Sequence, residues 1–332
     1  MMWERLDDSK VHCFLCSHHC KIIDGKRGIC GVRENRGGTL YTLVYDKVIA
    51  QNVDPIEKKP LFHFQPGSRS YSIATPGCNF RCLHCQNADI SQMPQDAHAI
   101  IGEAVEPASI VEEAKRYKCS SISYTYTEPT IFFELAFDTA RIAHEAGIKN
   151  VFVTNGYITK EALTEIRPYL DAANIDIKGF SDSFYRKVCG ARLKGVLEAI
   201  RLYHELGIWV ELTTLIIPNH NDSPQELREL ARFIASIDTN IPWHVTQFHP
   251  TYKLADQPRT PVETLRKARA IGLEEGLKFV YEGNVPGEGG ENTYCPSCGE
   301  LLVKRFGYSI LEYRLKEGAC PSCGGKIPGV GM

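Results

Sequence analysis

Three cysteines with a distinctive spacing lie in GCNFRCLHCQN, residues 77–87. Cys78, Cys82 and Cys85 follow the pattern C-x3-C-x2-C, directly after a short apolar run. A structural zinc site normally has four protein ligands, whereas a site with three leaves one position open for water, a cofactor or a substrate. Ligand sets made only of thiolates are typical of iron–sulfur clusters, while catalytic zinc usually also has histidine or carboxylate ligands. The spacing therefore predicts a [4Fe-4S] cluster in which one iron lacks a cysteine ligand.

Two Cys-Pro-Ser-Cys knuckles near the C-terminus are close to the zinc-ribbon pattern. Their cysteines are Cys295, Cys298, Cys320 and Cys323. Residues 301–308 and 310–315 between them have the composition of short strands, so structural zinc would stabilise a segment too small for a core of its own. This segment has five basic and three acidic side chains, an excess smaller than a dedicated nucleic-acid arm would show. We therefore expect no nucleic-acid partner.

Four more cysteines near the N-terminus have the spacing C-x2-C-x3-C-x9-C. They are Cys13, Cys16, Cys20 and Cys30. Structural zinc or iron is the first interpretation and an auxiliary iron–sulfur cluster the second, because four thiolates satisfy either. A redox-active centre would relay an electron here, whereas zinc would only hold the chain that leads into the first strand.

The composition is that of an ordinary globular protein, with 332 residues, 43% hydrophobic, 23% charged and a net charge of -2. This charge provides no overall attraction to nucleic acid or to an anionic membrane. The sequence has no apolar stretch long enough to cross a membrane and no export signal at its start, so we expect a cytoplasmic protein. Disulfides are then unlikely for its thirteen cysteines, and the isolated Cys119 and Cys189 are expected to be small buried hydrophobic residues.

Between the cysteine groups, β-rich runs alternate with helical patterns, as in parallel βα units. The candidate strands are 71–75, 121–125, 150–154, 173–177, 209–217, 244–248 and 278–281. Two helices have the start signals of a capping box, at Ser223 to Glu226 and at Thr260 to Glu263. Three helices end at a glycine suited to a left-handed C-cap before the next strand, in HEAGIKNVFV, HELGIWVELT and LEEGLKFVYE.

Polar residues at the ends of these strands favour a barrel over a doubly wound open sheet, because the βα loops of barrels build active sites. They are Thr127, Glu128, Thr154, Asn155, Asp176, Lys178, Gln247 and His249. We predict an α/β fold, a partial (β/α)6-type TIM barrel with small cysteine-rich metal-binding modules at both ends. The predicted division is 1–64 for the N-terminal module and lead-in, 65–285 for the core barrel and 286–332 for the zinc-ribbon-like module.

The cysteine motif resembles the signature of the radical S-adenosylmethionine (radical SAM) superfamily, and within it the branch of pyruvate formate-lyase activating enzymes. In that superfamily S-adenosylmethionine chelates the unique iron, and the reduced cluster cleaves this cofactor to a 5'-deoxyadenosyl radical. The stretches CFLCSHHC, GICGVREN, DPIEKKPLFHF and DIKGFSDSFY further resemble the AmmeMemoRadiSam-system radical enzymes, and this resemblance implies no substrate.

The resemblance assigns cofactor-binding roles to residues at three strand ends. YTYTEP (124–129) is similar to a Gly-Gly-Glu-Pro segment that meets the cofactor's amino group, with Glu128 matching and both glycines replaced. VTNG (153–156) is similar to Asp-Thr-Asn-Gly, with Asn155 matching and Val153 in place of the acid. DIKGF (176–180) is similar to Asp-Leu-Lys, which implies that Asp176 and Lys178 lie near the ribose and methionine moieties.

Two histidines have weaker matches. His84 occupies the position where the family places an aromatic residue against the adenine, and His249 is similar to a histidine that touches the ribose. Glu211 lies roughly where relatives carry an arginine, and the opposite charge prevents us from transferring a role to it.

The resemblance implies an enzyme that abstracts hydrogen from an unidentified substrate and receives an electron from a donor such as flavodoxin or ferredoxin. One alternative is an activase that makes a glycyl radical on a partner protein, and another is modification of a small molecule or peptide. An alternative of another class is a non-catalytic binding module that uses its metals only as structural supports. We expect no membrane association.

Overall fold

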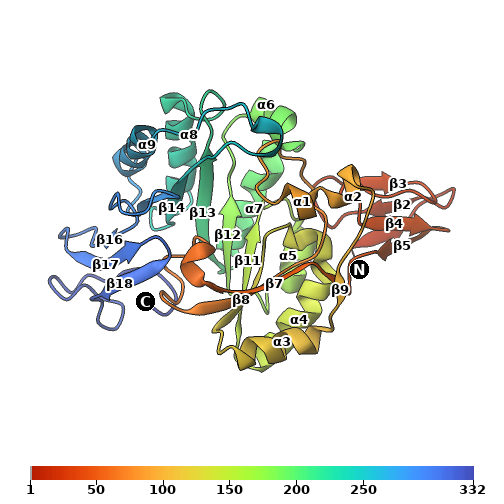
Figure 1. Ribbon diagram of the computed structural model, residues 1–332, viewed down its shortest axis with the longest axis horizontal. Coiled ribbons are helices and arrows are strands. Elements are labelled where there is room, and N and C mark those ends of the chain that lie inside the picture. The colour runs from red at the N-terminus through yellow and green to blue at the C-terminus, as the bar shows by residue number, and fades with distance from the viewer. Residues whose placement is uncertain (1) are drawn as a thin grey trace.

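A central eight-stranded sheet organises the structure, a computed structural model that describes residues 2–332 (Figure 1). The strand order is β15-β14-β13-β12-β11-β10-β8-β7, and all neighbours are parallel except the antiparallel edge pair β7 and β8. The strands are β7 (Ala50–Pro55), β8 (Arg69–Ala74), β10 (Ser121–Tyr124), β11 (Lys149–Thr154), β12 (Ala172–Asp176), β13 (Trp209–Ile216), β14 (Trp243–Gln247) and β15 (Val280–Gly283).

This architecture confirms the predicted α/β class with a central parallel sheet. All seven candidate strands form, with ends shifted by a few residues, and they follow one another in chain order across the sheet. The sheet has one parallel strand more than the predicted (β/α)6 type, because β15 adds to β14 after the last long helix. It remains open, since β7 and β15 are its two edges.

Helices connect the parallel strands and bury one apolar face each against the sheet. The longer ones are α3 (Pro107–Arg116), α4 (Phe133–Glu145), α5 (Lys160–Ile166), α7 (Leu193–Glu205), α8 (Pro224–Ala235) and α9 (Val262–Glu274). Shorter segments are α1 (Ala88–Ser91), α2 (Met93–Asp96), α6 (Asp182–Phe184), the π-turn η3 (Tyr185–Cys189) and the 3₁₀ turns η1 (Ile56–Lys58), η2 (Pro129–Phe132) and η4 (Tyr252–Leu254). None of the helices in residues 2–332 combines the length and the apolar character needed to cross a membrane.

One of the two predicted capping boxes forms and the other does not. The Ser223 hydroxyl accepts a hydrogen bond from the Glu226 amide at 3.2 Å, as expected for the start of α8. The prediction for Thr260 was wrong: α9 begins after Pro261 without a side-chain cap. The buried Thr260 hydroxyl instead donates to the Ile216 carbonyl at 2.5 Å and accepts from the Phe248 amide, because tertiary partners on β13 and after β14 compete for it.

The predicted glycine C-caps are confirmed. Gly147, Gly207 and Gly276 follow α4, α7 and α9 with φ values of 73°, 74° and 94°. Residues with a side chain rarely adopt this left-handed backbone conformation. Glycine is therefore favoured at these three positions, where the helix ends and the chain turns towards the next strand.

The N-terminal residues form small sheets at one end of the molecule (Figure 1). β1 (Trp3–Arg5), β2 (Val11–Cys13) and β3 (Cys20–Ile22) make one sheet, β4 (Arg33–Arg36) pairs with β5 (Thr39–Thr42), and β6 (Lys47–Val48) pairs with β9 (Glu103–Ala104). The Arg33 guanidinium pairs with the Glu134 carboxylate at 2.5 Å, and the Thr159 hydroxyl donates to the Phe14 carbonyl at 2.8 Å. These buried contacts fix the module against α4 and the start of α5.

Residues 55–64 cross the inner face of the sheet after the edge strand β7. The Glu211 carboxylate on β13 accepts hydrogen bonds from the amides of Phe62 and His63 at 3.0 and 2.7 Å. The Asn174 side chain on β12 donates to the Pro60 carbonyl at 2.8 Å. Glu211 therefore anchors residues 55–64 to the sheet. We call these residues the floor segment, because they close one side of the space that the sheet surrounds. The three-part division of the chain stays a prediction, although 50–64 contributes both an edge strand and this floor to the central sheet.

The C-terminal module packs on the other end of the sheet (Figure 1). It contains β16 (Thr293–Tyr294), β17 (Leu301–Phe306) and β18 (Ser309–Tyr313), and the two predicted strands correspond to β17 and β18. The Arg305 guanidinium lies 4.3 Å from the centre of the Phe62 ring and donates to the Phe62 carbonyl at 3.0 Å. The module therefore rests directly on the floor segment.

Candidate active site

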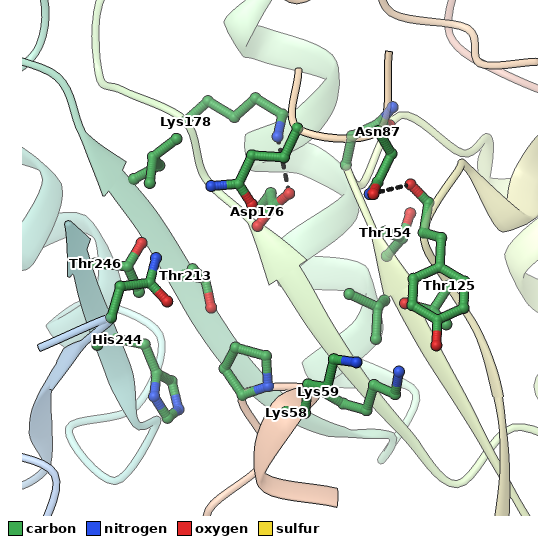
Figure 2. Close-up of a pocket in the computed structure, with 18 of the residues that line it drawn as sticks. Lys58, Lys59, Asn87, Thr125, Thr154, Asp176, Lys178, Thr213, His244 and Thr246 are labelled. Atoms are coloured by element: carbon green, nitrogen blue, oxygen red, sulfur yellow. Dashed lines mark hydrogen bonds and ion pairs between the residues drawn. The ribbon is translucent and has the colours of Figure 1, made fainter. Parts of the chain in front are cut away.

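A cavity of about 600 Å³ opens above the floor segment, at the carboxyl ends of the parallel strands. All three motif cysteines line it, together with Glu128, Asn155, Asp176 and Lys178. Figure 2 shows Thr125, Thr154, Asp176 and Lys178 around one side of this space. The fold therefore brings together the motif and the polar residues that the sequence placed at separate strand ends, as parallel sheets do.

The cysteine motif forms a loop after β8 that is held by backbone contacts. The amides of Arg81 and Leu83 donate to the carbonyls of Cys189 and Val188 at 2.8 and 2.9 Å. Cys189 is buried as expected, and its thiol is a neighbour of Cys82 that sequence reasoning missed. This neighbouring thiol holds the pKa of Cys82 below the usual range.

Burial has the opposite effect on the other two thiols of the motif. It raises the pKa of Cys78 well above the usual range, and the nearby Glu128 carboxylate adds to this rise. Burial also raises the pKa of Cys85. Metal coordination would overcome these effects, because thiols are deprotonated when they bind a metal. Three thiols lining one open cavity fit a cluster that has a free iron position.

Glu128 connects the ends of β10 and β11. One of its carboxylate oxygens accepts hydrogen bonds from the Thr130 amide and hydroxyl and from the Thr154 hydroxyl, at 3.0, 2.6 and 2.8 Å. The other accepts from the Asn155 amide at 2.8 Å. Burial raises the pKa of this carboxyl, although the four hydrogen bonds oppose the rise. Glu128 is thus a brace for the site, and one lone pair of the second oxygen stays available to a ligand.

Asn155 faces the motif loop as well as the cavity. Its side-chain amide donates to the Asn79 side-chain oxygen at 2.7 Å and lies 3.8 Å from the Cys78 sulfur. Its side-chain oxygen accepts from the Tyr157 amide at 3.0 Å. These bonds orient the first cysteine relative to the end of β11.

Asp176 and Lys178 form an ion pair at the end of β12, with 2.8 Å between the Lys178 ammonium and the Asp176 carboxylate (Figure 2). Burial lowers the pKa of Lys178, but Asp176 and the thiols of Cys82 and Cys189 raise it well above its usual range. The ammonium therefore remains charged and is matched by one carboxylate.

The two candidate histidines have different positions. His84 lines the cavity, is buried, and stacks on Phe184 with 6.3 Å between ring centres. Burial lowers its pKa to about 3, so its ring is neutral and suited to stacking. His249 is exposed and does not line the cavity, so the structure does not bring it to the site. Because β14 already ends at Gln247, the residues of this strand that line the cavity are His244 and Thr246.

Tyr126 stands where the resembling family has glycine, and it keeps a glycine-like backbone. Its φ is 61°, in the left-handed region that is uncommon for a bulky side chain. Its carbonyl accepts from the Asn87 side chain at 2.8 Å, which ties this turn to the motif loop. The turn therefore has a left-handed backbone at this position although the residue is not glycine.

Several residues that line the cavity were missed by sequence reasoning. They are Lys58, Lys59, His244, Thr246, Glu282 and Tyr308. Lys58 and Lys59 lie in DPIEKKPLFHF, a stretch whose resemblance to family motifs implies no chemical role for them.

Comparison with known proteins agrees with this geometry. Residues 72–234, which include the motif loop and the ends of β10 to β13, match the family described as the Radical SAM superfamily. An uncharacterised protein of Methanocaldococcus jannaschii, MJ0808, is 52% identical over 330 residues that cover 98% of each chain. The chain belongs to the radical SAM superfamily. Membership implies a [4Fe-4S] cluster and S-adenosylmethionine as cofactors.

Two further radical SAM proteins are similar to this one. The pyruvate formate-lyase-activating enzyme of Clostridium pasteurianum is 24% identical over 229 residues, which cover 65% of this chain and 93% of that enzyme. This similarity supports the activating-enzyme-like branch. A radical SAM methyltransferase from Sphaerobacter thermophilus has a similar fold, with a TM-score of 0.52 and 17% identity over 72% of this chain and 71% of the other.

The two outer cysteine groups of this radical SAM enzyme differ in geometry. At the C-terminus the sulfur atoms lie within 4.8 Å of one another, with 3.6 Å between Cys295 and Cys323 and 3.7 Å between Cys298 and Cys320. Tetrahedral zinc with bonds of about 2.3 Å would separate its sulfurs by about 3.8 Å, so this group fits such an ion. Among the cysteine groups in residues 2–332, only this one is so compact.

The N-terminal cysteines instead surround a small second cavity with apolar walls. Burial raises the pKa of Cys16 above the usual range and that of Cys30 to about 11. The His18 ring forms a hydrogen bond of 2.8 Å with the Asn79 carbonyl, next to the first motif cysteine. The N-terminal group therefore lies beside the motif loop.

Proposed function

We propose that this radical SAM enzyme abstracts hydrogen from a substrate bound in the cavity at the ends of β8 to β15. The observation that carries the proposal is the position of Cys78, Cys82 and Cys85, three thiols at one side of a 600 Å³ space that polar strand ends surround. A cavity of this size suits a cofactor together with a small substrate or a short segment of one.

The residues around the cavity would bind and orient the cofactor. The three cysteines hold the cluster, Glu128 and Asn155 position the amino end of S-adenosylmethionine, and the Asp176–Lys178 pair faces its ribose and methionine moieties. His84 provides a neutral ring for the adenine. When bound, cluster and cofactor supply a 5'-deoxyadenosyl radical that takes a hydrogen atom from a substrate carbon. The buried walls exclude water from this reaction.

The substrate is either a partner protein or a small molecule or short peptide. The name of the Clostridium relative favours an activase that acts on a partner protein. The closed floor at 55–64 and the turn with Gly307 and Tyr308, both lining the cavity, favour a small molecule or a short peptide segment. Membership of a family of enzymes argues against a purely structural role for the metals.

We further propose zinc in the C-terminal group, where the sulfur spacing fits it, and either zinc or iron in the N-terminal group. An electron donor such as flavodoxin or ferredoxin would reduce the catalytic cluster. The motifs shared with AmmeMemoRadiSam-system enzymes support that subgroup.

Release of 5'-deoxyadenosine by anaerobically reconstituted, reduced protein tests the proposal. Cell extract, separated into protein and small-molecule fractions, is added to wild type and to Cys82→Ala. We expect release that the variant abolishes, and stimulation by the small-molecule fraction. Stimulation by the protein fraction alone would favour the activase, whereas no release from protein that holds a reduced [4Fe-4S] cluster would overturn the proposed reaction.

A further inference from the structure

The floor of the cavity carries two lysines that cofactor binding does not use. Lys58 and Lys59 lie at the end of η1, in the segment that crosses the sheet, and both line the cavity. Figure 2 shows them on the opposite side of the cavity from Asn87, Asp176 and Lys178. They therefore face the space that remains beyond the cofactor-binding strand ends.

One carboxylate serves both of these lysines. The two oxygens of Asp54 lie 2.8 Å from the Lys58 ammonium and 2.6 Å from the Lys59 ammonium. The Tyr126 hydroxyl also donates to Asp54. Burial opposes ionisation of Asp54, but the hydrogen bonds from Lys58, Lys59 and Tyr126 keep its pKa below the usual range. Two positive charges thus share one negative charge.

The charge on Lys59 is largely removed from water, whereas the Lys58 side chain is 42% exposed. The side chain of Lys59 is 2% exposed, and its ammonium lies 4.5 Å from the centre of the Tyr126 ring. That ring and Asp54 are its two partners in residues 2–332, which leaves an N–H group unassigned. A buried charge without a full counter-charge is costly, so a bound anion would stabilise this arrangement.

The other charged groups of the cavity do not supply this counter-charge. Glu57 accepts a hydrogen bond from the Gly67 amide at 2.8 Å and Glu291 from the Gly287 amide at 2.9 Å, and neither acts on Lys59. Lys178 is matched one to one by Asp176 on the cofactor side. Glu282 lies on β15 and interacts with Arg266 and Arg269. The charged groups that act on Lys59 are Asp54 and Lys58.

We propose that Lys58 and Lys59 bind an anionic group of the substrate, a carboxylate or a phosphate. The assignment rests on the proposed function, because it gives the substrate class of the same cavity. The anionic end of the substrate contacts the floor, and its reacting carbon points towards the cofactor-binding strand ends. Threonines at 125, 213 and 246 line the walls between these two ends.

Isothermal titration calorimetry of anion binding tests this site without radical chemistry. The oxidised holoenzyme with S-adenosylmethionine is titrated with inorganic phosphate in one arm and with acetate in the other. The preferred anion distinguishes a phosphate ester from a carboxylate. We expect saturable binding of at least one anion, weakened at least tenfold in Lys59→Gln.

Two further variants keep the test decisive. Lys58→Gln should fold, because this side chain is 42% exposed, and it should weaken the same binding several-fold. Lys267→Gln, at a 69% exposed lysine on α9, is the matched control and should bind like wild type. Absence of binding in wild type, or wild-type affinity in both floor variants, would overturn the proposal. Neither result depends on 5'-deoxyadenosine release, so failure of the anion site and failure of the proposed reaction are distinguishable.

Discussion

Glu128 receives four hydrogen bonds, and this makes it the residue on which the ends of β10 and β11 depend. A side chain expected only to meet the cofactor is also an internal brace. Its removal should therefore affect stability as well as cofactor binding.

We expect Glu128→Gln to lower the free energy of unfolding by about 2 kcal/mol, because an amide group would face donors where a carboxylate accepts. It should also weaken S-adenosylmethionine binding. Urea unfolding measures the first effect and equilibrium binding the second. Glu112→Gln, at an exposed position in α3, is the control and should change neither. Wild-type stability in Glu128→Gln would contradict the bracing role.

Lys59 should give a measurable pH dependence. Burial lowers its pKa to about 8 from 10.5, although the Asp54 hydrogen bond opposes this. Between pH 8 and 10.5 the unfolded chain then binds more protons at this lysine than the folded chain, so its contribution to stability rises with pH by up to about 3 kcal/mol. Below pH 8 both states are protonated and the contribution is constant.

The comparison with Lys59→Met isolates this contribution. We expect the unfolding free energy of wild type to increase relative to that of the variant as the pH rises from 8 to 10.5. Asp54, Lys58 and Tyr126 are the charged or titratable groups that face this ammonium, and they are the same in both proteins. Parallel pH profiles would show that Lys59 titrates normally.

At the scale of elements, the motif loop depends on the N-terminal module. A Cβ atom built at Gly77 would lie 2.7 Å from a Val32 methyl group and 3.4 Å from the Cys30 carbonyl, and its φ is 105°. Glycine thus permits the close approach of the two cysteine-rich segments.

Gly77→Ala should displace this loop and lower the iron bound at the catalytic site. The matched control is Gly37→Ala, which has a similarly unfavourable φ of 61° but nothing within 4 Å of its added Cβ. Iron and acid-labile sulfide per chain measure the effect after reconstitution. Equal losses in both variants would attribute the effect to backbone strain and not to the contact with the module.

Sequence reasoning succeeded for elements whose signals are local. Each βα unit carries its own strand composition, and three of the helices are followed by a C-cap glycine, so all seven strands were predicted. It failed where the partner is distant in sequence: Thr260 bonds to β13 and does not cap α9. Lys59 entered the site only because Asn174 and Glu211 hold the crossing segment from the neighbouring strands β12 and β13.

At the scale of the whole molecule, the C-terminal module contributes to the cavity as well as to stability. Its β17–β18 turn, with Gly307 and Tyr308, lines the cavity, and Arg305 fixes it to Phe62 on the floor. Loss of the proposed zinc should therefore disturb the end of the cavity that this turn lines.

We expect Cys298→Ser to lose one zinc per chain and to lower the melting temperature of the module, because metal binding provides much of the folding energy of so small a segment. Metal analysis and calorimetry measure both effects. Ser297→Ala, between the same two knuckle cysteines, is the control and should retain the zinc. Full stability without metal would contradict a structural role for the ion.

The electron paramagnetic resonance spectrum of the reduced protein tests the central claim most directly, since it reports on the iron that lacks a cysteine ligand. The account predicts a [4Fe-4S]⁺ signal that changes when S-adenosylmethionine is added and that is lost in Cys82→Ala. A four-iron signal in wild type that S-adenosylmethionine leaves unchanged, or an S-adenosylmethionine-sensitive signal that survives in Cys82→Ala, would contradict an open cluster held by these three cysteines.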